Sequence, residues 1–564
     1  MMNRKYMLVA TILALASLTM YARTDDAGVA HVVTARQFGA VPDDSKDDTK
    51  ALRKAAEYCR THPGTTLVIE PGVYRLRDSK AEQLESEVMA GKMGRNPEQV
   101  IFTPYYPYVS GLDFSGAEDT RVMARGAILM CEGWMEPLSI VRTRNFHLEG
   151  LAIDYLRKPM TEGNIVKVTD ESIVVQFDNR RRLTPEMPIT RMVIWDHEAN
   201  GVFHRPFYFP EGKFLGDNRV EFPIQLPRHL QGARLCALHS FHFRPAILIS
   251  QSDSTTLEGV TIHSQPGMGV VGFDSKDIFI HDLSVTPAPG FTFSTNTDAT
   301  HFASCRGMVA IEESLFRGQG DDATNVHGYY HDIERGDDGW TRLVLHAPTY
   351  THAQQADVPE VGDTLEFSSA ATLVPQRTFV VTQVRHHPQS PTVDVRLDAP
   401  LPAVTDGYYL FNSSKLPKLR FCKNLVWGNL ARGVLVKTRD VRVEGNVFRG
   451  CTGSAVHVGA ESDWREGAHA RDVVIRDNMM IDCGTDGGQF GASGIAVVIQ
   501  APETDHTFLH ENIVVENNVV TTRYGNRCGI ALRNIKGVRI GGNSVRGCQQ
   551  DVDIHSCEDV VLSH

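Results

Sequence analysis

Four short segments in the last quarter of the chain share one pattern, and this repeat constrains the fold more than any other feature. Each has an alternating apolar run, a break at Gly, Asp or Asn, an asparagine and a second apolar run: VRVEGNVFRG (441–450), VVIRDNMMID (473–482), IVVENNVVTT (513–522) and VRIGGNSVRG (538–547). The asparagines at 446, 478, 518 and 543 are 32, 40 and 25 residues apart. Runs with a period of two predict strands, and irregular periods of this length are typical of solenoids.

A third strand-like piece follows the first three segments: GSAVHV (453–458), GIAVVI (494–499) and GIALRN (529–534). A coil of three such strands cannot bury its own apolar face, so successive coils stack and form parallel sheets. The repeat therefore predicts an all-β protein, a right-handed parallel β-helix. We expect the asparagines to form a ladder at the bend, where asparagine tolerates left-handed backbone.

Two stretches, residues 159–239 and 334–414, interrupt the repeat. Both alternate strictly and are rich in Val, Ile, Phe and Trp, which makes disordered loops a poor explanation. We interpret them as small antiparallel β-barrels inserted into turns of the helix. The predicted division is a signal peptide at 1–22, β-helix at 31–158, 240–333 and 415–564, and the two barrels at 159–239 and 334–414.

The N-terminus has the form of a secretory signal. Arg4 and Lys5 precede an apolar run from Tyr6 to Met20, which is too short for a stable membrane span. We therefore expect export to the periplasm or the medium. No cysteine precedes Cys59, so we expect no lipid anchor at the cleavage site.

The formal charge of -11 argues against nucleic acid as a partner, because the chain has no basic block. It also makes a polyanionic substrate a poor match. No later stretch is apolar enough to predict a membrane anchor.

Ten cysteines in an exported chain raise the possibility of disulfides. Cys451, Cys483 and Cys548, however, each follow a repeat asparagine by five residues. Thiols at one position of a repeat are most simply small side chains stacked in the core. We expect these three to point inward and stay reduced.

The stretch GQGDDATNVHG (318–328) places Asp321 and Asp322 side by side between glycines. A solvated turn is the ordinary explanation, since Gly, Asp and Asn favour turns. However, Asp298 in TFSTNTDATHF (292–302) precedes Asp321 by 23 residues, about one coil, and adjacent rungs lie about 4.8 Å apart. Three converging carboxylates disfavour full ionisation, which sets an acid beside a base as glycoside hydrolysis requires.

The same acids lead to an expectation about stereochemistry. Consecutive residues in an extended segment point to opposite sides, and a bend at Gly320 would return Asp321 to the cleft while leaving room for water. Inverting glycosidases separate their two carboxyls by about 6.5–9.5 Å and retaining ones by about 5–5.5 Å. We expect inversion, without a covalent intermediate.

Several motifs resemble known families. FGAVPDDSKDDTKALRKAAEYC (38–59) followed by TTLVIEPGVYRL (65–76) resembles the entry segment of pectate-lyase-like β-helix enzymes, and NTD, GDD and HG resemble the polygalacturonase layout. The pair NTDATHF and GQGDDATNVHG, the two insertions and ESDWREG (461–467) are more similar to glycoside hydrolase family 110. This resemblance covers essentially the whole mature chain.

The family resemblance implies an exported, exo-acting, inverting α-1,3-galactosidase. Its substrates would be oligosaccharides or glycoconjugates with terminal α-galactose, either blood-group-B-type or linear. Asp321 would be the proton donor, and Asp298 and Asp322 would position water. We expect no cofactor and no metal, and the resemblance hints at a homodimer.

Other residues are candidates for substrate binding. Trp464, one of five tryptophans, offers an indole face for a sugar, with hydroxyl acceptors at Glu461, Asp463 and Glu466. A packing tryptophan in a charged loop explains the local sequence equally well, and the family resemblance favours binding. His327 is either a structural histidine or a sugar contact.

The segment GVLVKTRD (433–440) departs from the polygalacturonase pattern. It replaces the Arg-x-Lys pair that grips a uronate, and it leaves the roles of Lys437 and Arg439 open.

Three alternative functions remain. The scaffold also carries polygalacturonase-like hydrolases and polysaccharide lyases, and in a lyase the two consecutive acids would be calcium ligands. A non-catalytic glycan-binding β-helix is the third alternative. Crowded carboxylates argue against it, since binding alone does not need them.

Overall fold

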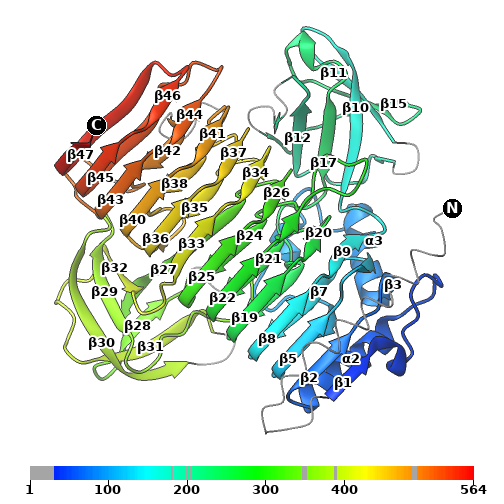
Figure 1. Ribbon diagram of the computed structural model, residues 1–564, viewed down its shortest axis with the longest axis horizontal. Helices are drawn as coiled ribbons and strands as arrows, with labels where there is room; N and C mark the ends of the chain where they lie inside the picture. The colour runs from blue at the N-terminus through cyan, green and yellow to red at the C-terminus, as the bar shows by residue number, and fades with distance from the viewer. Residues whose placement is uncertain are drawn as a thin grey trace.

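The computed structural model describes residues 31–178, 182–198, 201–202, 206–345, 352–386, 390–485 and 492–563. The predicted signal peptide at 1–22 lies outside these residues. The described chain is a parallel β-helix that carries two inserted antiparallel sheets (Figure 1). The predicted fold class is confirmed.

The helix has three columns of parallel strands, each strand pairing with the equivalent strand of the next coil. The first column contains β1 (His31–Thr34), β2 (Thr65–Val68), β5 (Glu118–Met123), β8 (Arg144–Glu149), β19 (Asp253–Glu258), β22 (Lys276–His281), β25 (Arg306–Glu312), β33 (Lys418–Cys422), β36 (Arg439–Glu444), β40 (Arg471–Arg476) and β43 (His510–Glu516). The second contains β4 (Ser110–Asp113), β7 (Glu136–Val141), β18 (Ile247–Ser250), β21 (Val270–Phe273), β24 (Thr300–Ala303), β27 (Thr324–Arg335), β35 (Val434–Val436), β38 (Val456–Val458) and β42 (Ala492–Val497).

The third column contains β3 (Gly72–Arg77), β6 (Ala127–Glu132), β9 (Ala152–Tyr155), β20 (Thr261–Ile262), β23 (Ser284–Val285), β26 (Leu315–Arg317), β34 (Leu425–Trp427), β37 (Val447–Arg449), β41 (Met479–Ile481), β44 (Val519–Thr521) and β46 (Ser544–Arg546). In the last coils β45 (Cys528–Gly541) and β47 (Gln550–Ser563) run through both the second and the first columns. Alternate side chains of all three columns point inward and form one continuous apolar core.

The repeat asparagines form a ladder along the turn between the first and third columns. The side-chain oxygen of Asn478 accepts from the backbone N–H of Asn446 at 3.0 Å, and Asn518 and Asn543 continue the series at 3.1 and 2.9 Å. Asn424 extends the ladder one coil earlier, with 2.8 Å from its N–H to Asn446. The turn residues lie outside the sheets, and these side chains supply hydrogen-bond partners for their backbone N–H groups inside the core.

The left-handed residue of each turn precedes the asparagine, which corrects the expectation that the asparagine itself adopts this backbone. Gly445, Asp477, Asn517 and Gly542 have φ values of 68°, 57°, 57° and 64°. Gly, Asp and Asn are the residue types that tolerate this region, which explains the break before every repeat asparagine.

The first interruption of the repeat is an antiparallel sheet between β9 and β18. Its strands are β10 (Met160–Val168), β11 (Ile173–Phe177), β12 (Arg191–Asp196), β13 (Gly201–Val202), β14 (Phe207–Tyr208), β15 (Lys213–Gly216), β16 (Arg219–Phe222) and β17 (Arg234–Leu238), with the short helix η2 (Arg228–Leu230). Among the described residues the pairings form an open path from β13 to β15, not a closed ring. The sheet has its own apolar core.

The second interruption closes into a barrel. The outer half of β27 pairs with β28 (Thr341–Val344) and with β32 (Tyr408–Asn412). The ring is completed through β31 (Thr392–Leu397), β30 (Pro375–His386) and β29 (Thr364–Ser369). This barrel also has a separate apolar core.

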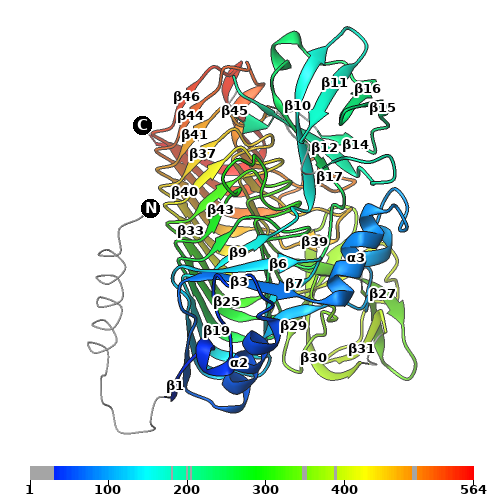
Figure 2. The ribbon, with the colours of Figure 1, turned by 90° about the vertical axis from the view of Figure 1, so that its right-hand side faces the viewer.

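Both insertions flank the second column. The first enters at the turn before that column, between β9 and β18, and the second leaves the column directly from β27. Figure 2 shows them on the same side of the β-helix, one above the other.

The N-terminal coils are accompanied by η1 (Ala35–Phe38), α2 (Thr49–Thr61), α3 (Ser79–Met89) and α4 (Glu98–Ile101). Figure 1 shows α2 at the N-terminal end of the β-helix, near β1 and β2. Its buried face (Leu52, Ala55, Ala56 and Cys59) joins the main core. Among the described residues no helix is long and apolar enough to cross a membrane.

All ten cysteines lie in the described part of the chain, and all are free thiols. Cys451 and Cys483 are buried in the core, and burial raises the pKa of Cys451 well above its usual range. Cys548 is only partly buried, with its Sγ 3.9 Å from Ser493 Oγ. The stacking expectation therefore describes the first two thiols and not the third.

The ladder leads to a prediction about stability. Asn478→Ala leaves the N–H of Asn446 and the carbonyl of Val443, both bonded to the Asn478 side chain, without partners inside the core. Each such group costs about 1–3 kcal/mol, so the free energy of unfolding should fall by about 3 kcal/mol. Urea denaturation measures this. The exposed Asn164 is the matched control, and Asn164→Ala should change the free energy by less than about 0.5 kcal/mol.

Candidate active site

The acids lie in the turn that leads into the second column, at one register position of successive coils. Thr300 pairs with Thr324, and Thr324 pairs with Val434. Asp298 lies two residues before Thr300, and Asp322 lies two residues before Thr324. Arg432 lies two residues before Val434. Strand register alone therefore stacks two carboxylates and a guanidinium.

The three carboxyl groups converge. One oxygen from each of Asp298, Asp321 and Asp322 lies within 4.8 Å of the others. Gly320 permits this turn because a Cβ at that position would stand 2.1 Å from the carbonyl oxygen of Asn296 in the preceding coil. One coil here has 24 residues, so the residue in register with Asp298 is Asp322. This corrects the prediction from the 23-residue spacing, which placed Asp321 in register with Asp298.

Asp298 is buried, with 8% of its side chain exposed, and makes two short contacts. Its Oδ1 accepts from the backbone N–H of Asp322 at 3.2 Å, and its Oδ2 lies 2.8 Å from Nδ1 of His301. Burial, reinforced by the charge of Asp321, raises the pKa of Asp298 well above its usual range.

Asp322 is buried against Arg432. Its Oδ1 accepts from the Arg432 backbone N–H at 2.7 Å, and its Oδ2 lies 3.1 Å from Nη2. Burial raises the pKa of Asp322, and the Arg432 guanidinium acts against that rise.

Asp321 is the accessible member of the trio, with 27% of its side chain exposed. Its Oδ2 lies 4.0 Å from Nη1 of Arg191, which reaches the acids from β12 of the first insertion. Arg191 is held by the carbonyl oxygens of Asn296 and Gly320 at 3.2 and 2.8 Å, and its guanidinium stacks on Phe241 at 3.5 Å. The first insertion thus contributes directly to the site.

Four of the residues expected to bind substrate form a buried network beneath the acids: His327, Lys437, Glu461 and Glu466. The ammonium of Lys437 contacts the carboxylates of both Glu461 and Glu466. Burial alone would lower the pKa of Lys437, but these two charges outweigh it and raise the pKa. Glu461 also lies 3.9 Å from Nη2 of Arg432, which links this network to Asp322.

The other two members of ESDWREG lie on the surface. Asp463 is exposed, and 54% of Trp464 is exposed. The turn that carries them is closed by a bridge between Glu461 and Glu466, and β39 (Glu466–Gly467) pairs with β27. The turn therefore presents its tryptophan outward while both glutamates face Lys437.

Arg439 connects the β-helix to the second insertion. Its Nη2 contacts both oxygens of Glu366 in β29, at 2.8 and 3.0 Å. Neither Arg439 nor Lys437 faces the acids as a free cation.

Sequence reasoning missed Arg191, His301 and Arg432. Arg432 carried a usable signal, because aligning NVHG with the later strand GVLVK puts it at the Asp322 position. His301 lies three residues after Asp298 in NTDATHF. Arg191 carried no such signal, since only the folding of the first insertion brings it to Gly320.

The acid trio is also the one group among the described residues whose ligand atoms are close enough to hold a metal ion together. All three ligands are carboxylates, the donor type that Ca²⁺ and Mg²⁺ prefer. Carboxylate convergence alone does not separate a cation site from an acid–base site, so the functional assay requires a chelator arm.

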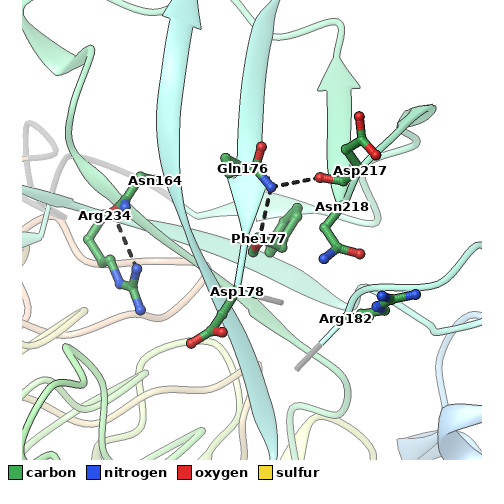
Figure 3. A pocket seen from close by; sticks show the side chains of 8 residues that line it. All are labelled: Asn164, Gln176, Phe177, Asp178, Arg182, Asp217, Asn218 and Arg234. Atoms are coloured by element: carbon green, nitrogen blue, oxygen red, sulfur yellow. Dashed lines mark hydrogen bonds between the residues drawn. The ribbon is translucent and has the colours of Figure 1, made fainter. Parts of the chain in front are cut away.

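A cavity of about 670 Å³ lies elsewhere, on the first insertion (Figure 3). Its lining is polar: Gln176 donates to the carbonyl oxygen of Asp217 at 2.8 Å, and Arg234 donates to Asn164 at 3.2 Å. The cavity includes none of the three converging acids.

Sequence comparison identifies relatives that are similar over most of the chain. The chain is 27% identical to alpha-1,3-galactosidase B of Akkermansia muciniphila, over 87% of this chain and 63% of that protein. It is 26% identical to alpha-1,3-galactosidase B of Parabacteroides distasonis, with 86% and 84% covered. Alpha-1,3-galactosidase A of Streptomyces avermitilis is 25% identical, with 91% and 87% covered. The chain thus spans less than two thirds of the Akkermansia relative. The resemblance to family 110 is confirmed.

No family model matches the chain. Among solved structures, the A-module of mannuronan C-5 epimerase AlgE4 from Azotobacter vinelandii aligns with a TM-score of 0.44 and 14% identity, over 94% of this chain and all of that one. The family 28 exopolygalacturonase of Yersinia enterocolitica aligns with a TM-score of 0.41 and 12% identity, over 95% and 78%.

His510 and His239 lie away from the acids and are buried, and their hydrogen bonds hold each ring in its neutral form. In His510, Nδ1 accepts from the backbone N–H of Ala470 at 3.1 Å, and Nε2 faces the carbonyl oxygen of Val498. In His239, Nδ1 faces the carbonyl oxygen of Pro188, and Nε2 faces the hydroxyl of Thr161. Burial lowers the pKa of each to about 4.

These histidines predict loss of stability in acid. Each histidine has a pKa near 6.5 in the unfolded chain and about 4 in the native chain. Their contribution to the free energy of unfolding is therefore fully present above pH 6.5 and is lost as the pH falls toward 4. Each should remove up to about 3 kcal/mol from the free energy of unfolding between pH 6.5 and 4. Urea denaturation across this range measures the slope. His510→Gln should flatten it, and the same change at exposed His281 should not.

Proposed function

We propose that the protein is an exported, exo-acting α-1,3-galactosidase that hydrolyses terminal α-1,3-linked galactose with inversion. The observation that carries the proposal is the convergence of Asp298, Asp321 and Asp322 at a turn that both insertions flank. The relatives named alpha-1,3-galactosidase support the choice of sugar and linkage.

The exposure of the acids supports inversion. Asp321 alone has an open face, so it is suited to protonate the leaving oxygen directly. Asp298 and Asp322 are 8% and 3% exposed and are engaged by neighbours, so a water molecule, and neither of these carboxylates, would attack the anomeric carbon. The separation of the carboxyls does not support inversion, because their oxygens lie within 4.8 Å and the expected range was about 6.5–9.5 Å.

The covering of the second column supports action at chain ends. Arg191 of the first insertion stands beside Asp321, and His352 of the second insertion packs on His301, with ring centroids 4.8 Å apart. Contacts from both insertions at the acids and at His301 favour entry of a terminal sugar over a threaded polymer.

The burial of Lys437 argues against a polyuronate substrate. Its side chain is inaccessible, and two glutamates neutralise it. A polygalacturonase-like hydrolase or a lyase would need a cation free to grip a uronate. Trp464, by contrast, is free to stack on a neutral sugar.

Export and a homodimer remain part of the proposal. Export is supported by the basic and apolar N-terminal segment, and the dimer by the family resemblance alone.

The proposal is tested with linear and fucosylated α-1,3-galactosyl trisaccharides followed by NMR. We expect free galactose from one or both, with the β-anomer as the first product. First appearance of α-galactose would assign a covalent nucleophile and refute inversion. Ultraviolet absorbance from an unsaturated product would identify a lyase, and loss of activity with chelator would assign a cation to the acid trio. No release from either trisaccharide would contradict the proposed function.

The division of roles predicts a dependence on the leaving group. Asp321→Asn and Asp322→Asn should each lower kcat/KM for a trisaccharide by about 10²–10⁴-fold. With nitrophenyl α-galactoside, whose leaving oxygen needs little protonation, Asp321→Asn should recover much of its activity and Asp322→Asn should not. Asp253→Asn on the exposed first column is the matched control and should behave as wild type. Equal recovery of both variants would remove Asp321 as the donor.

A further inference from the structure

Asp298, His301 and His327 form a continuous hydrogen-bonded row. Oδ2 of Asp298 lies 2.8 Å from Nδ1 of His301, and Nε2 of His301 lies 2.8 Å from Nε2 of His327. Nδ1 of His327 lies 3.0 Å from the carbonyl oxygen of Gly328. We call these three side chains the Asp–His–His row.

Three hydrogen bonds need three protons. The Gly328 carbonyl can only accept, so His327 must carry a proton on Nδ1. The contact between the two Nε2 atoms needs a second proton, and the contact between His301 and Asp298 needs a third. Two neutral imidazoles supply only two, and an ionised carboxylate supplies none.

We propose that the Asp–His–His row holds one proton more than two neutral imidazoles and a carboxylate, so that Asp322 and not Asp298 takes the proton of the attacking water. This inference rests on the proposed function for its catalytic half. The count is the same whether the additional proton sits on Asp298, His301 or His327, since moving it along the row breaks no hydrogen bond. The row is electrically neutral in each case.

The surroundings of the row agree with this count. Burial lowers the pKa of His301 to about 4 and that of His327 to about 3, so a charged imidazole is disfavoured. Burial raises the pKa of Asp298 and that of Asp322 alike, so the two acids are distinguished by their hydrogen-bond partners and not by burial.

The titratable groups nearest the row include Asp321 and Asp322, each with an oxygen within 4.8 Å of Asp298, and Glu466, whose Oε1 lies 3.7 Å from Nε2 of His327. The ring centroids of His352 and Tyr329 lie 4.8 Å from those of His301 and His327. The charge of Glu466 acts against the lowering of both histidine pKa values but does not outweigh burial.

Asp322 differs from Asp298 in the kind of partner that it has. Both of its oxygens face donors of Arg432, the backbone N–H and Nη2, and neither donor can accept a proton. These contacts are complete with an ionised carboxylate. Asp298, by contrast, contacts His301, whose Nδ1 can accept a hydrogen bond from a protonated carboxyl. This contact distinguishes the two acids.

The reaction then balances with one base and one acid. Water adds to the anomeric carbon and gives a proton to Asp322, while the bond to the leaving oxygen breaks and that oxygen takes the proton of Asp321. A proton passes from Asp322 through solvent to Asp321 and restores the enzyme. Asp298 keeps its proton throughout, and its Oδ1 holds the backbone N–H of Asp322. His301 and His327 are positioning residues.

Neutron diffraction from a perdeuterated crystal of the unliganded protein at pH 7 tests the count without any assay of activity. We expect deuterium on Nδ1 of His327, between the two Nε2 atoms, and between His301 and Asp298. His239 is the control in the same map, because it is equally buried and should carry one ring deuterium, facing Pro188. Two deuterium atoms in the row instead of three would overturn the proposal, whatever the enzyme hydrolyses.

Substitution tests the catalytic half. The amide of Asp298→Asn can donate to His301 and accept from Asp322, as the protonated acid does, so kcat/KM should fall by at least about tenfold less than in Asp322→Asn. Asp322→Asn should lose about 10²–10⁴-fold. His301→Gln removes one imidazole of the row. If the thermal stability of this variant equals that of the wild type, a change in its kcat/KM comes from the row and not from misfolding. Equal losses in the two Asp→Asn variants would make Asp298 an ionised base and overturn the assignment. Hydrolysis of neither trisaccharide by the wild type would refute the proposed function but not the proton count.

Discussion

Backbone hydrogen bonds between stacked coils set the position of every other part of this molecule. Each coil aligns with the next residue by residue, and the ladder from Asn424 to Asn543 holds the turn between the first and third columns in the same alignment. Because that register is shared by the second column, Asp298, Asp322 and Arg432 become vertical neighbours. A slip of one residue would turn the acid positions away from each other.

The insertions turn this stacked surface into a site. A bare β-helix would leave the turn before the second column open to solvent. The first insertion brings Arg191 to Asp321, and the second brings His352 over His301. Burial then raises the pKa of Asp298 and Asp322 and lowers the pKa of the histidines beside them. The proton distribution follows from that burial and from which neighbours can accept a hydrogen bond.

Two buried lysines, Lys437 and Lys415, each form ion pairs with two carboxylates from other segments of the chain. Lys437 binds Glu461 and Glu466 beneath the acids. Lys415 binds Asp274 and Asp357 at 2.7 and 3.3 Å, where the second insertion meets the β-helix. A buried ion pair is costly to break, since removal of one partner leaves an uncompensated charge. Both clusters therefore specify how distant segments fit together.

Local patterns were enough to predict the β-helix and the candidate acids, because a period of two and a recurring asparagine report directly on strand and turn geometry. The sequence also indicated Asp298, Asp321 and Asp322, since the length of one coil relates them. Three placements become visible only in the folded chain: Glu461 and Glu466 face Lys437, Asp463 and Trp464 face solvent, and Arg191 belongs to the site. Those placements depend on contacts between segments far apart in the chain, and no local period encodes such contacts.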